Sequence, residues 1–335
     1  MQCIWYRRLM NRIISLIFIV SISIFGVALT PSKGDMDYFI YHRKTILAEE
    51  LIVNEKFQEA LDIYASIFEY FDFVFIREFK ISAQLAIITN DNLLAIKYLK
   101  LGIKNGWSIT EIKKNNLLSP LLSQIPKSEI TDLITSYNKR INISLKNEVQ
   151  ELMKIDQKMA VKALFRIGQK SKIRYNEQKF APHSECQLTK LIEIFETNGF
   201  PSERLIGNSY WVSTILSHHN SISPAYNRKD TLFNYIKPKL FQAIKDGQMS
   251  PYEYALIDNW KIASESNHNK SSYGFLEPNL DNYSLITADN LRAKIGLRSI
   301  ELRNALVEIQ TKYDIDLFLP GRPWQDGKII VDSKT

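Results

Sequence analysis

The chain has 335 residues, of which 45% are hydrophobic and 24% are charged. Such a composition can build ordinary buried cores, so it excludes wholesale disorder, a collagen-like chain and a multi-pass membrane protein. The formal net charge is +7, but Arg7, Arg8 and Arg12 contribute three of these charges, and the remaining +4 is spread along the chain without a basic block. A nucleic-acid partner is therefore not predicted.

Turn-forming residues are scarce, with 12 glycines and 11 prolines in the whole chain. Sandwiches and barrels of β-strands usually need more of them. We therefore predict an all-α (mainly α) protein, in which antiparallel helix-hairpin repeats are followed by a compact helical domain.

Residues 1–30 combine a basic start with an uncharged stretch at residues 13–30. These 18 residues would reach about 27 Å as a helix, just enough to span a hydrocarbon core of about 30 Å. Gly26 and Ala28 also supply the small residues of a signal-peptide cleavage site. The segment is predicted to be a signal peptide or, if uncleaved, an N-terminal anchor in the inner membrane. In both cases the body from about residue 31 lies outside the cytoplasm, in the cell envelope or periplasm.

The chain contains two cysteines, Cys3 and Cys186, and Cys3 precedes the hydrophobic stretch. No internal disulfide is therefore predicted for the body of the protein. His183 and Cys186 have a spacing that suits a metal, but no second pair of ligands accompanies them. Gly-rich phosphate loops and the common zinc-protease and hydrolase motifs are absent from the sequence. We predict neither a metal nor a cofactor.

Residues 37–126 repeat a pattern after about 35 residues. Leu47 and Ala48 open the apolar face of the first unit, Ala60 and Ala95 occupy matched positions, and polar turns lie near residues 54–56 and 90–92. The pattern resembles tetratricopeptide units, in which two antiparallel helices need a small side chain where their axes cross. Residues 109–126 are predicted to cap the module. The resemblance implies a protein or peptide as the partner of these repeats.

Residues 128–310 are predicted to form the helical domain, followed by a C-terminal tail at 311–335. Almost forty residues after Pro126 lack a helix breaker, which predicts one long helix, bent or straight, with Ser128 as its cap. Its apolar stripe runs through Leu145, Val149 and Leu152 and is interrupted by Asp156.

Two further apolar helix faces are interrupted by an ionisable residue, the first by His219 and the second by Asp258. Because an unpaired buried charge costs several kcal/mol, Asp156, His219 and Asp258 are predicted to meet in one polar pocket. Tyr254, His218 and Trp260 would line it. The pocket is either a network that fixes the packing of the helices or a binding or catalytic site, and the sequence leaves both interpretations open.

The order of motifs from about residue 145 to residue 305 resembles an uncharacterised bacterial family, domain-of-unknown-function family 6624. The matching residues are Asp156, Gln157, Gly199, Pro201, Gly207, His219, Gly247, Pro251, Ala255, Leu256, Asp258, Tyr273, Gly274, Arg292, Gly296 and Leu297. The resemblance adds Gln157 and Tyr273 to the candidate binding residues. Where the family has glutamine, arginine and threonine, this chain has His218, Asn259 and Phe275. The family implies no reaction.

Two functions remain open. The favoured one is a cell-envelope interaction or ligand-binding module that uses its helical repeats. The alternative is an extracytoplasmic, hydrolase-like enzyme in which His219 is the base and Asp156 or Asp258 orients it. Ser213 and Ser217 lie on other faces of the same predicted helix, so no complete set of nucleophile, base and orienting residue is present. Whether the protein is an enzyme is therefore left open.

Overall fold

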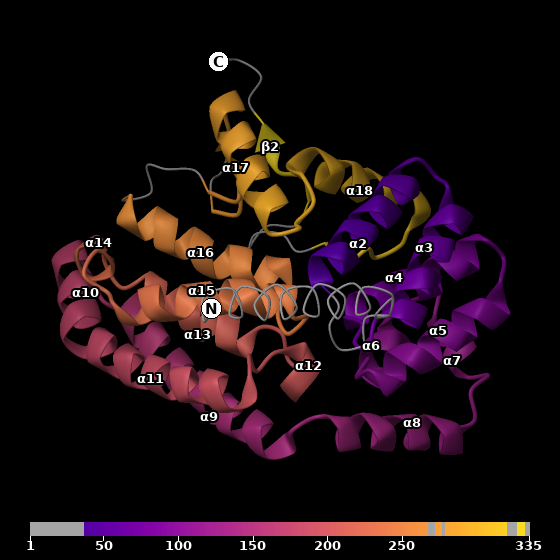
Figure 1. Cartoon of the computed structure of the whole chain (residues 1–335), viewed down its shortest axis with the longest axis horizontal. Helices are drawn as coiled ribbons and strands as arrows, with labels where there is room; N and C mark the ends of the chain where they lie inside the picture. Colours follow the sequence, from indigo (N-terminus) through magenta and orange to yellow (C-terminus); the bar gives the residue numbers. More distant parts are fainter. Residues whose placement is uncertain (1–36, 267–271, 277–278, 320–326, 332–335) are drawn as a thin grey trace, which may run out of the picture. The chain divides into compact units, whose positions relative to one another are not determined.

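The computed structural model describes residues 37–266, 272–276, 279–319 and 327–331. Within these ranges the protein is almost entirely helical, which confirms the predicted all-α class (Figure 1). The exceptions are two short strands, β1 (Asn279–Leu280) and β2 (Ile330–Val331), which pair in parallel. The predicted N-terminal segment, residues 1–30, lies outside the described residues. No helix of the described part is long and apolar enough to cross a membrane.

The helices follow one another in this order: α2 (Tyr38–Val53), α3 (Phe57–Tyr70), α4 (Ile76–Ile88), α5 (Asn92–Lys104), α6 (Ile109–Lys114), α7 (Ser119–Leu122), α8 (Lys127–Arg140), α9 (Ile143–Leu164), α10 (Gln169–Tyr175), the π-helix η1 (Asn176–Phe180), α11 (Ala181–Asn198), α12 (Glu203–Ile206), α13 (Trp211–Asn220), α14 (Pro224–Asn227), α15 (Leu232–Lys245), α16 (Pro251–Glu265), α17 (Asn282–Lys294) and α18 (Ile300–Tyr313).

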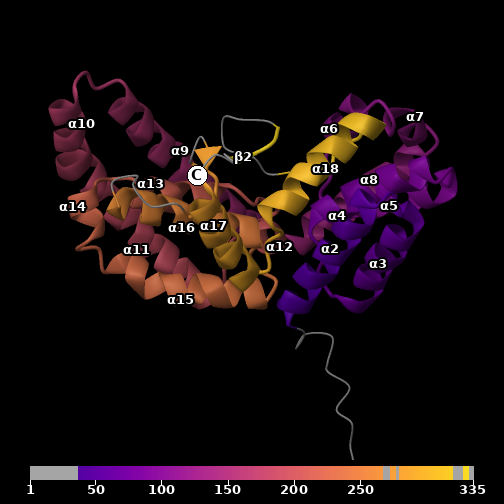
Figure 2. The same ribbon diagram turned by 90° about the horizontal axis from the view of Figure 1, so that it is seen from above.

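The first four helices form two consecutive pairs, α2 with α3 and α4 with α5, at the predicted turns (Figures 1 and 2). Ala60 and Ala95 are completely buried, as close helix packing requires. Leu47 does not lie on the apolar face of α2, because it is 44% exposed while Tyr41, Ala48 and Ile52 are buried. The helix pairs are present, and their organisation as tetratricopeptide repeats stays a prediction.

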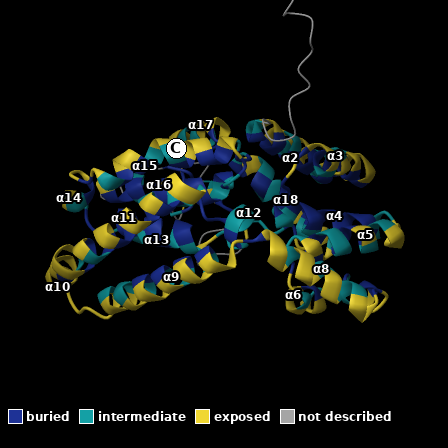
Figure 3. Ribbon diagram, turned by 60° about the horizontal axis from the view of Figure 1, so that its bottom comes forward, coloured by how far each residue is buried: buried dark blue, intermediate teal, exposed yellow. Residues whose placement is uncertain are grey.

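The prediction of one long helix after Pro126 is wrong. Helix α8 ends at Arg140, Ile141 is extended and buried, and α9 begins at Ile143. Asn142 stabilises this break because its side chain accepts a hydrogen bond from the Leu145 amide, and its own amide donates to the carbonyl of Leu205. Helix α8 itself has no buried residue (Figure 3) and begins at Lys127, so Ser128 is not its cap.

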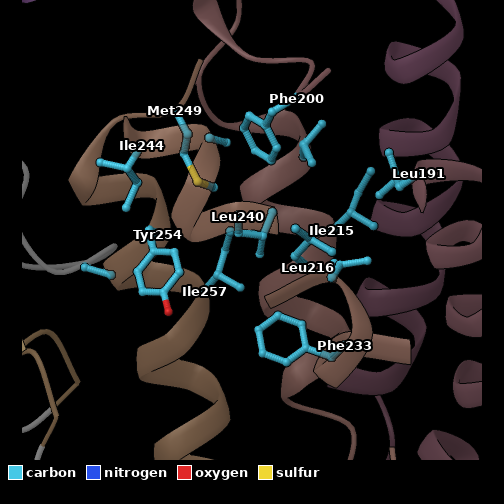
Figure 4. Close-up of a cluster of buried hydrophobic side chains, with 14 of the residues drawn as sticks. Leu191, Phe200, Ile215, Leu216, Phe233, Leu240, Ile244, Met249, Tyr254 and Ile257 are labelled. Carbon is cyan, nitrogen blue, oxygen red and sulfur yellow. The ribbon is translucent and has the colours of Figure 1, made fainter. Parts of the chain in front are cut away.

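The second half of the chain is organised around α13, which packs against α9, α11 and α16. Its core is formed by apolar residues of α9, α11, α13, α15 and α16, and Figure 4 shows part of it, including Ile215, Leu216, Phe233, Leu240 and Ile257. Helix α9 contributes its predicted stripe, and Asp156 is buried together with that stripe. The last two residues of α13 before Asn220 are His218 and His219, so the core helix carries both candidate histidines.

The two halves of the described chain are in contact. Helix α2 packs against α15 and α18, and the C-terminal segment reaches α4, where Arg77 Nε donates to the carbonyls of Leu317 and Phe318. Residues from Asp37 onward form one compact unit. The predicted division into repeats, domain and tail stays a prediction.

Candidate functional site

His218 and His219 are successive residues on α13, so their side chains leave the helix about 100° apart and meet different neighbours. The structure pairs His218 with Asp156. The Nδ1–H of His218 donates to Oδ2 of Asp156, with 2.5 Å between the two atoms. The predicted pairing of Asp156 with His219 is therefore wrong. The spacing of apolar residues in α13 correctly placed His219 on the face that points to the core. The neighbouring residue, His218, is the one that contacts Asp156 on α9.

This pair is half open to solvent. Asp156 is fully buried, whereas 29% of the His218 side chain is exposed. Because a carboxylate only accepts hydrogen bonds, Asp156 fixes the proton of neutral His218 on Nδ1 and leaves Nε2 as the basic atom. Asp156 Oδ1 has no hydrogen-bond partner among the described residues. The arrangement is that of an oriented acid–base histidine.

His218 lines a pocket of about 350 Å³ between α9, the α10–η1 segment and the end of α13. Phe180 and Trp260 form aromatic walls, and the Phe180 ring meets the His218 ring edge-on at 6.5 Å between centroids. The remaining lining residues are Ala160, Ala163, Leu164, Lys172, Asn176, Ser221 and Ile222. Two of the predicted lining residues, His218 and Trp260, are therefore part of one pocket.

His219 belongs to a separate, closed network. It is completely buried, its Nε2 is hydrogen-bonded to Oδ2 of Asp230 at 3.1 Å, and its Nδ1 is hydrogen-bonded to the Ser184 hydroxyl at 2.9 Å. Lys261 Nζ lies 3.6 Å from the same Asp230 oxygen and donates to the carbonyl of Asn227 at 2.7 Å. Both ring nitrogens of His219 are thus occupied by neighbours inside the core. Such a residue fixes packing and has no free atom for a ligand.

The charges of this network act on Asp230. Burial acts to raise the pKa of its carboxyl, but the hydrogen bond from His219 and the charges of His219 and Lys261 outweigh burial and hold the pKa below the ordinary value. Asp230 follows the short helix α14, in the segment that connects α13 to α15. In the sequence, Asp230 is marked only by its position eleven residues after His219, and this spacing does not predict a contact between the two residues.

Asp258 has a third set of partners. Its Oδ1 accepts from Lys237 Nζ at 2.6 Å, and its Oδ2 accepts from the Tyr273 hydroxyl at 3.2 Å. Burial first, and then the charge of Asp258, raise the pKa of Tyr273 and of the neighbouring Tyr254. Among the described residues, no hydrogen bond or ion pair joins Asp258 to Asp156 or His219.

The predicted common pocket of Asp156, His219 and Asp258 is therefore three separate polar contacts. Gln157 takes part in none of them, because its amide nitrogen contacts the sulfur of Met153 at 3.9 Å. In the described part of the chain, no group of three His, Cys, Asp or Glu side chains is placed to hold a metal ion.

A second cavity, of about 230 Å³, lies where α2 and α4 meet the start of α16 and the segment after α17, and no sequence pattern predicted it. Glu49 is completely buried there and pairs with Arg77 at 2.8 Å and with Arg298 at 2.5 Å. Glu203 accepts a hydrogen bond from the Ile76 amide at 2.6 Å, and burial raises the pKa of Glu203 to about 7. The bonds of Glu203 to Ile76 and of Arg298 to Glu49 tie the helix pairs to the rest of the chain over more than 120 residues of sequence.

Comparison of the sequence with models of protein families and with curated proteins finds no match, and comparison with solved structures finds none. The resemblance to family 6624 therefore stays a prediction.

Proposed function

We propose that the protein binds a small amphipathic acid in the pocket beside His218. The observation that carries the proposal is the composition of the pocket wall. Its ionisable residues are His218 and Lys172, no carboxylate is among its lining residues, and Phe180, Ile222 and Trp260 provide apolar surface. Lys172 carries a positive charge and His218 can accept a proton, while the aromatic wall is apolar. This combination favours a ligand that has an acidic group and an apolar body.

The location of this function in the cell envelope rests on residues 1–30, as argued from the sequence. Binding of a protein or peptide by the α2–α5 helices is a further part of the proposal. It rests on the resemblance to tetratricopeptide units, in which the buried Ala60 and Ala95 are the matched packing positions. The charged cavity beside α2 and α4 offers these helices a concave surface.

The test uses two probes of the same shape, 3-phenylpropionate and its neutral amide. NMR titration should show saturable changes at the His218 ring for the acid, with binding at least about tenfold tighter than for the amide, because only the acid can pair with His218 and Lys172. Lys172→Gln and His218→Gln should each weaken binding of the acid. Lys190→Gln is the matched control, since Lys190 is exposed on α11 and does not line the pocket.

Two results would refute the binding proposal. The first is the absence of saturable binding of both probes. The second is equal affinity of the wild type and the His218→Gln variant for the acid, because the pocket would then not be the binding site.

A second candidate function, a hydrolase-like reaction, is favoured by one specific observation, the free Nε2 of a histidine whose Nδ1–H is held by a buried carboxylate. Ser221 is the hydroxyl residue among the described lining residues of the pocket, and its hydroxyl donates to the main-chain carbonyl of His218 at 2.9 Å. His218 would therefore act on water. Nε2 would remove a proton as the water oxygen bonds to an ester carbonyl carbon, and the imidazolium would return that proton to the departing alkoxide as its C–O bond breaks.

The probe for this candidate is p-nitrophenyl propionate. Hydrolysis by His218→Gln should fall at least about a hundredfold below the wild type, since a positioned base contributes that much or more. His183→Gln, which changes a histidine outside the lining of the pocket, should keep the wild-type rate. Equal rates in the wild type and His218→Gln would exclude the reaction and would leave the binding proposal untouched.

A further inference from the structure

The connection between α9 and α10 exposes an unusual group of apolar side chains. Leu164, Phe165 and Ile167 are 71%, 81% and 93% exposed, although they lie within four positions of one another. Figure 3 shows the connection between α9 and α10 coloured as exposed. Gly168 follows them with a φ of +81°, and a Cβ added there would meet no atom within 4 Å. Phe165 and Ile167, which do not line the pocket beside His218, therefore stand on a protruding turn and not in a groove.

The same segment concentrates positive charge. Residues 157–176 contain six cations and no aspartate or glutamate, and all six side chains are exposed. The six are Lys158, Lys162, Arg166, Lys170, Lys172 and Arg174. None of them forms an ion pair with a carboxylate of the described residues. The interpretation that the charge is spread along the chain without a basic block is wrong for this segment, which we call the basic tip (residues 158–174).

We propose that the basic tip is a membrane-binding element, which inserts Phe165 and Ile167 into the interface of an anionic bilayer while its lysines and arginines pair with lipid phosphates. Exposed apolar side chains surrounded by cations are what interfacial membrane binding requires. A nucleic acid would pair with the cations but would leave Phe165 and Ile167 in water. A fluid lipid interface accepts a convex tip without a preformed groove. An acidic protein partner would need a groove that fits the tip.

The proposal is independent of the ligand pocket. Leu164 and Lys172 line that pocket as well as belonging to the tip, but Phe165, Arg166, Ile167 and Lys170 do not line it. Variants at these four positions therefore test membrane binding without changing the pocket wall.

The experiment uses the full chain with Cys3→Ser and Cys186→Ser, so that one added cysteine can carry an environment-sensitive fluorophore. The label at Ile167→Cys should shift to the blue on vesicles of phosphatidylcholine with about 30% phosphatidylglycerol, and should shift little on pure phosphatidylcholine. Leu93→Cys is the matched control because Leu93 is 82% exposed on α5, away from the tip. Both labels experience any attachment through residues 13–30, so a shift restricted to position 167 reports the tip itself.

Arg166→Gln combined with Lys170→Gln should weaken vesicle binding. The lipid concentration that gives half of the full shift should rise about tenfold. A label at position 167 that does not respond to anionic vesicles would overturn the proposal, as would equal shifts at positions 93 and 167. A shift of equal size on neutral vesicles would overturn the electrostatic part. A blue shift produced by an oligonucleotide without lipid would assign the tip to nucleic acid instead.

Discussion

Two neighbouring histidines of α13 occupy opposite environments. His218 has one ring nitrogen bound by buried Asp156 and the other at a pocket that is open to solvent, whereas His219 has both nitrogens bound inside the core by Asp230 and Ser184. The difference comes from a rotation of about 100° per residue around the helix. A histidine held at both nitrogens fixes packing, and a histidine held at one can exchange a proton with a ligand. Substitutions at the two sites should therefore change different properties of the protein.

The largest effect is expected at the closed site. Asp230→Ala removes the carboxylate that faces His219 and Lys261, both of them buried, so the free energy of unfolding should fall by about 3–5 kcal/mol. Urea denaturation at neutral pH measures the change. Asp132→Ala is the control, because Asp132 is exposed on α8 and should shift stability by less than about 0.5 kcal/mol. A loss below about 1 kcal/mol for Asp230→Ala would mean that the network does not hold the core.

Acid should weaken the closed site in a defined pH range. Asp230 has a pKa lowered from 3.8, so its stabilising contribution is complete above pH 3.8 and is lost as the pH falls through the lower, folded-state value. The difference in unfolding free energy between the wild type and Asp230→Asn should be constant above about pH 5 and should narrow below about pH 4. Urea denaturation across this range gives the comparison. A difference that stays constant in acid would show that the Asp230 carboxylate is not stabilised by its partners.

A smaller loss is expected at the open site. Asp156→Asn removes a charged hydrogen-bond acceptor but keeps the shape of the side chain, and should cost about 1–3 kcal/mol of unfolding free energy. A double-mutant cycle with His218→Ala should give a coupling energy of about 1 kcal/mol or more. Asp156→Asn and Asp230→Asn, which belong to different networks, should be additive within about 0.5 kcal/mol. Strong coupling of the two aspartates would show that the networks of His218 and His219 are one network.

The smallest effect is expected at Asp258. Its partner Lys237 has 40% of its side chain exposed, and Asp258 keeps the Tyr273 hydroxyl when Lys237 is replaced. Lys237→Gln should therefore lower the free energy of unfolding by no more than about 1 kcal/mol, measured by urea denaturation under the same conditions. A loss comparable with that of Asp230→Ala would place Asp258 among the closed networks.

The sequence by itself determined much of this protein. Scarcity of glycine and proline indicated helices, the matched alanines indicated helix pairs, and the interrupted apolar faces identified Asp156, His219 and Asp258 as buried polar residues, all of which the structure confirms. These features follow from helical periodicity, which is a local property of the chain. The same periodicity specifies which face of a helix is buried and says nothing about what that face meets.

The tertiary structure alone decided the partners. Asp156 meets His218 because α9 packs on the side of α13 that carries this residue, and His219 meets Asp230 because the segment after α13 folds back over it. At the break between α8 and α9, the Asn142 amide likewise bonds to the carbonyl of Leu205, more than sixty residues away, in addition to the local cap that the Asn142 side chain forms on Leu145. Such contacts arise from the packing of distant segments, and no local pattern encodes them. The sequence predicts which face of a helix is buried, whereas the fold determines which residue that face contacts across the core.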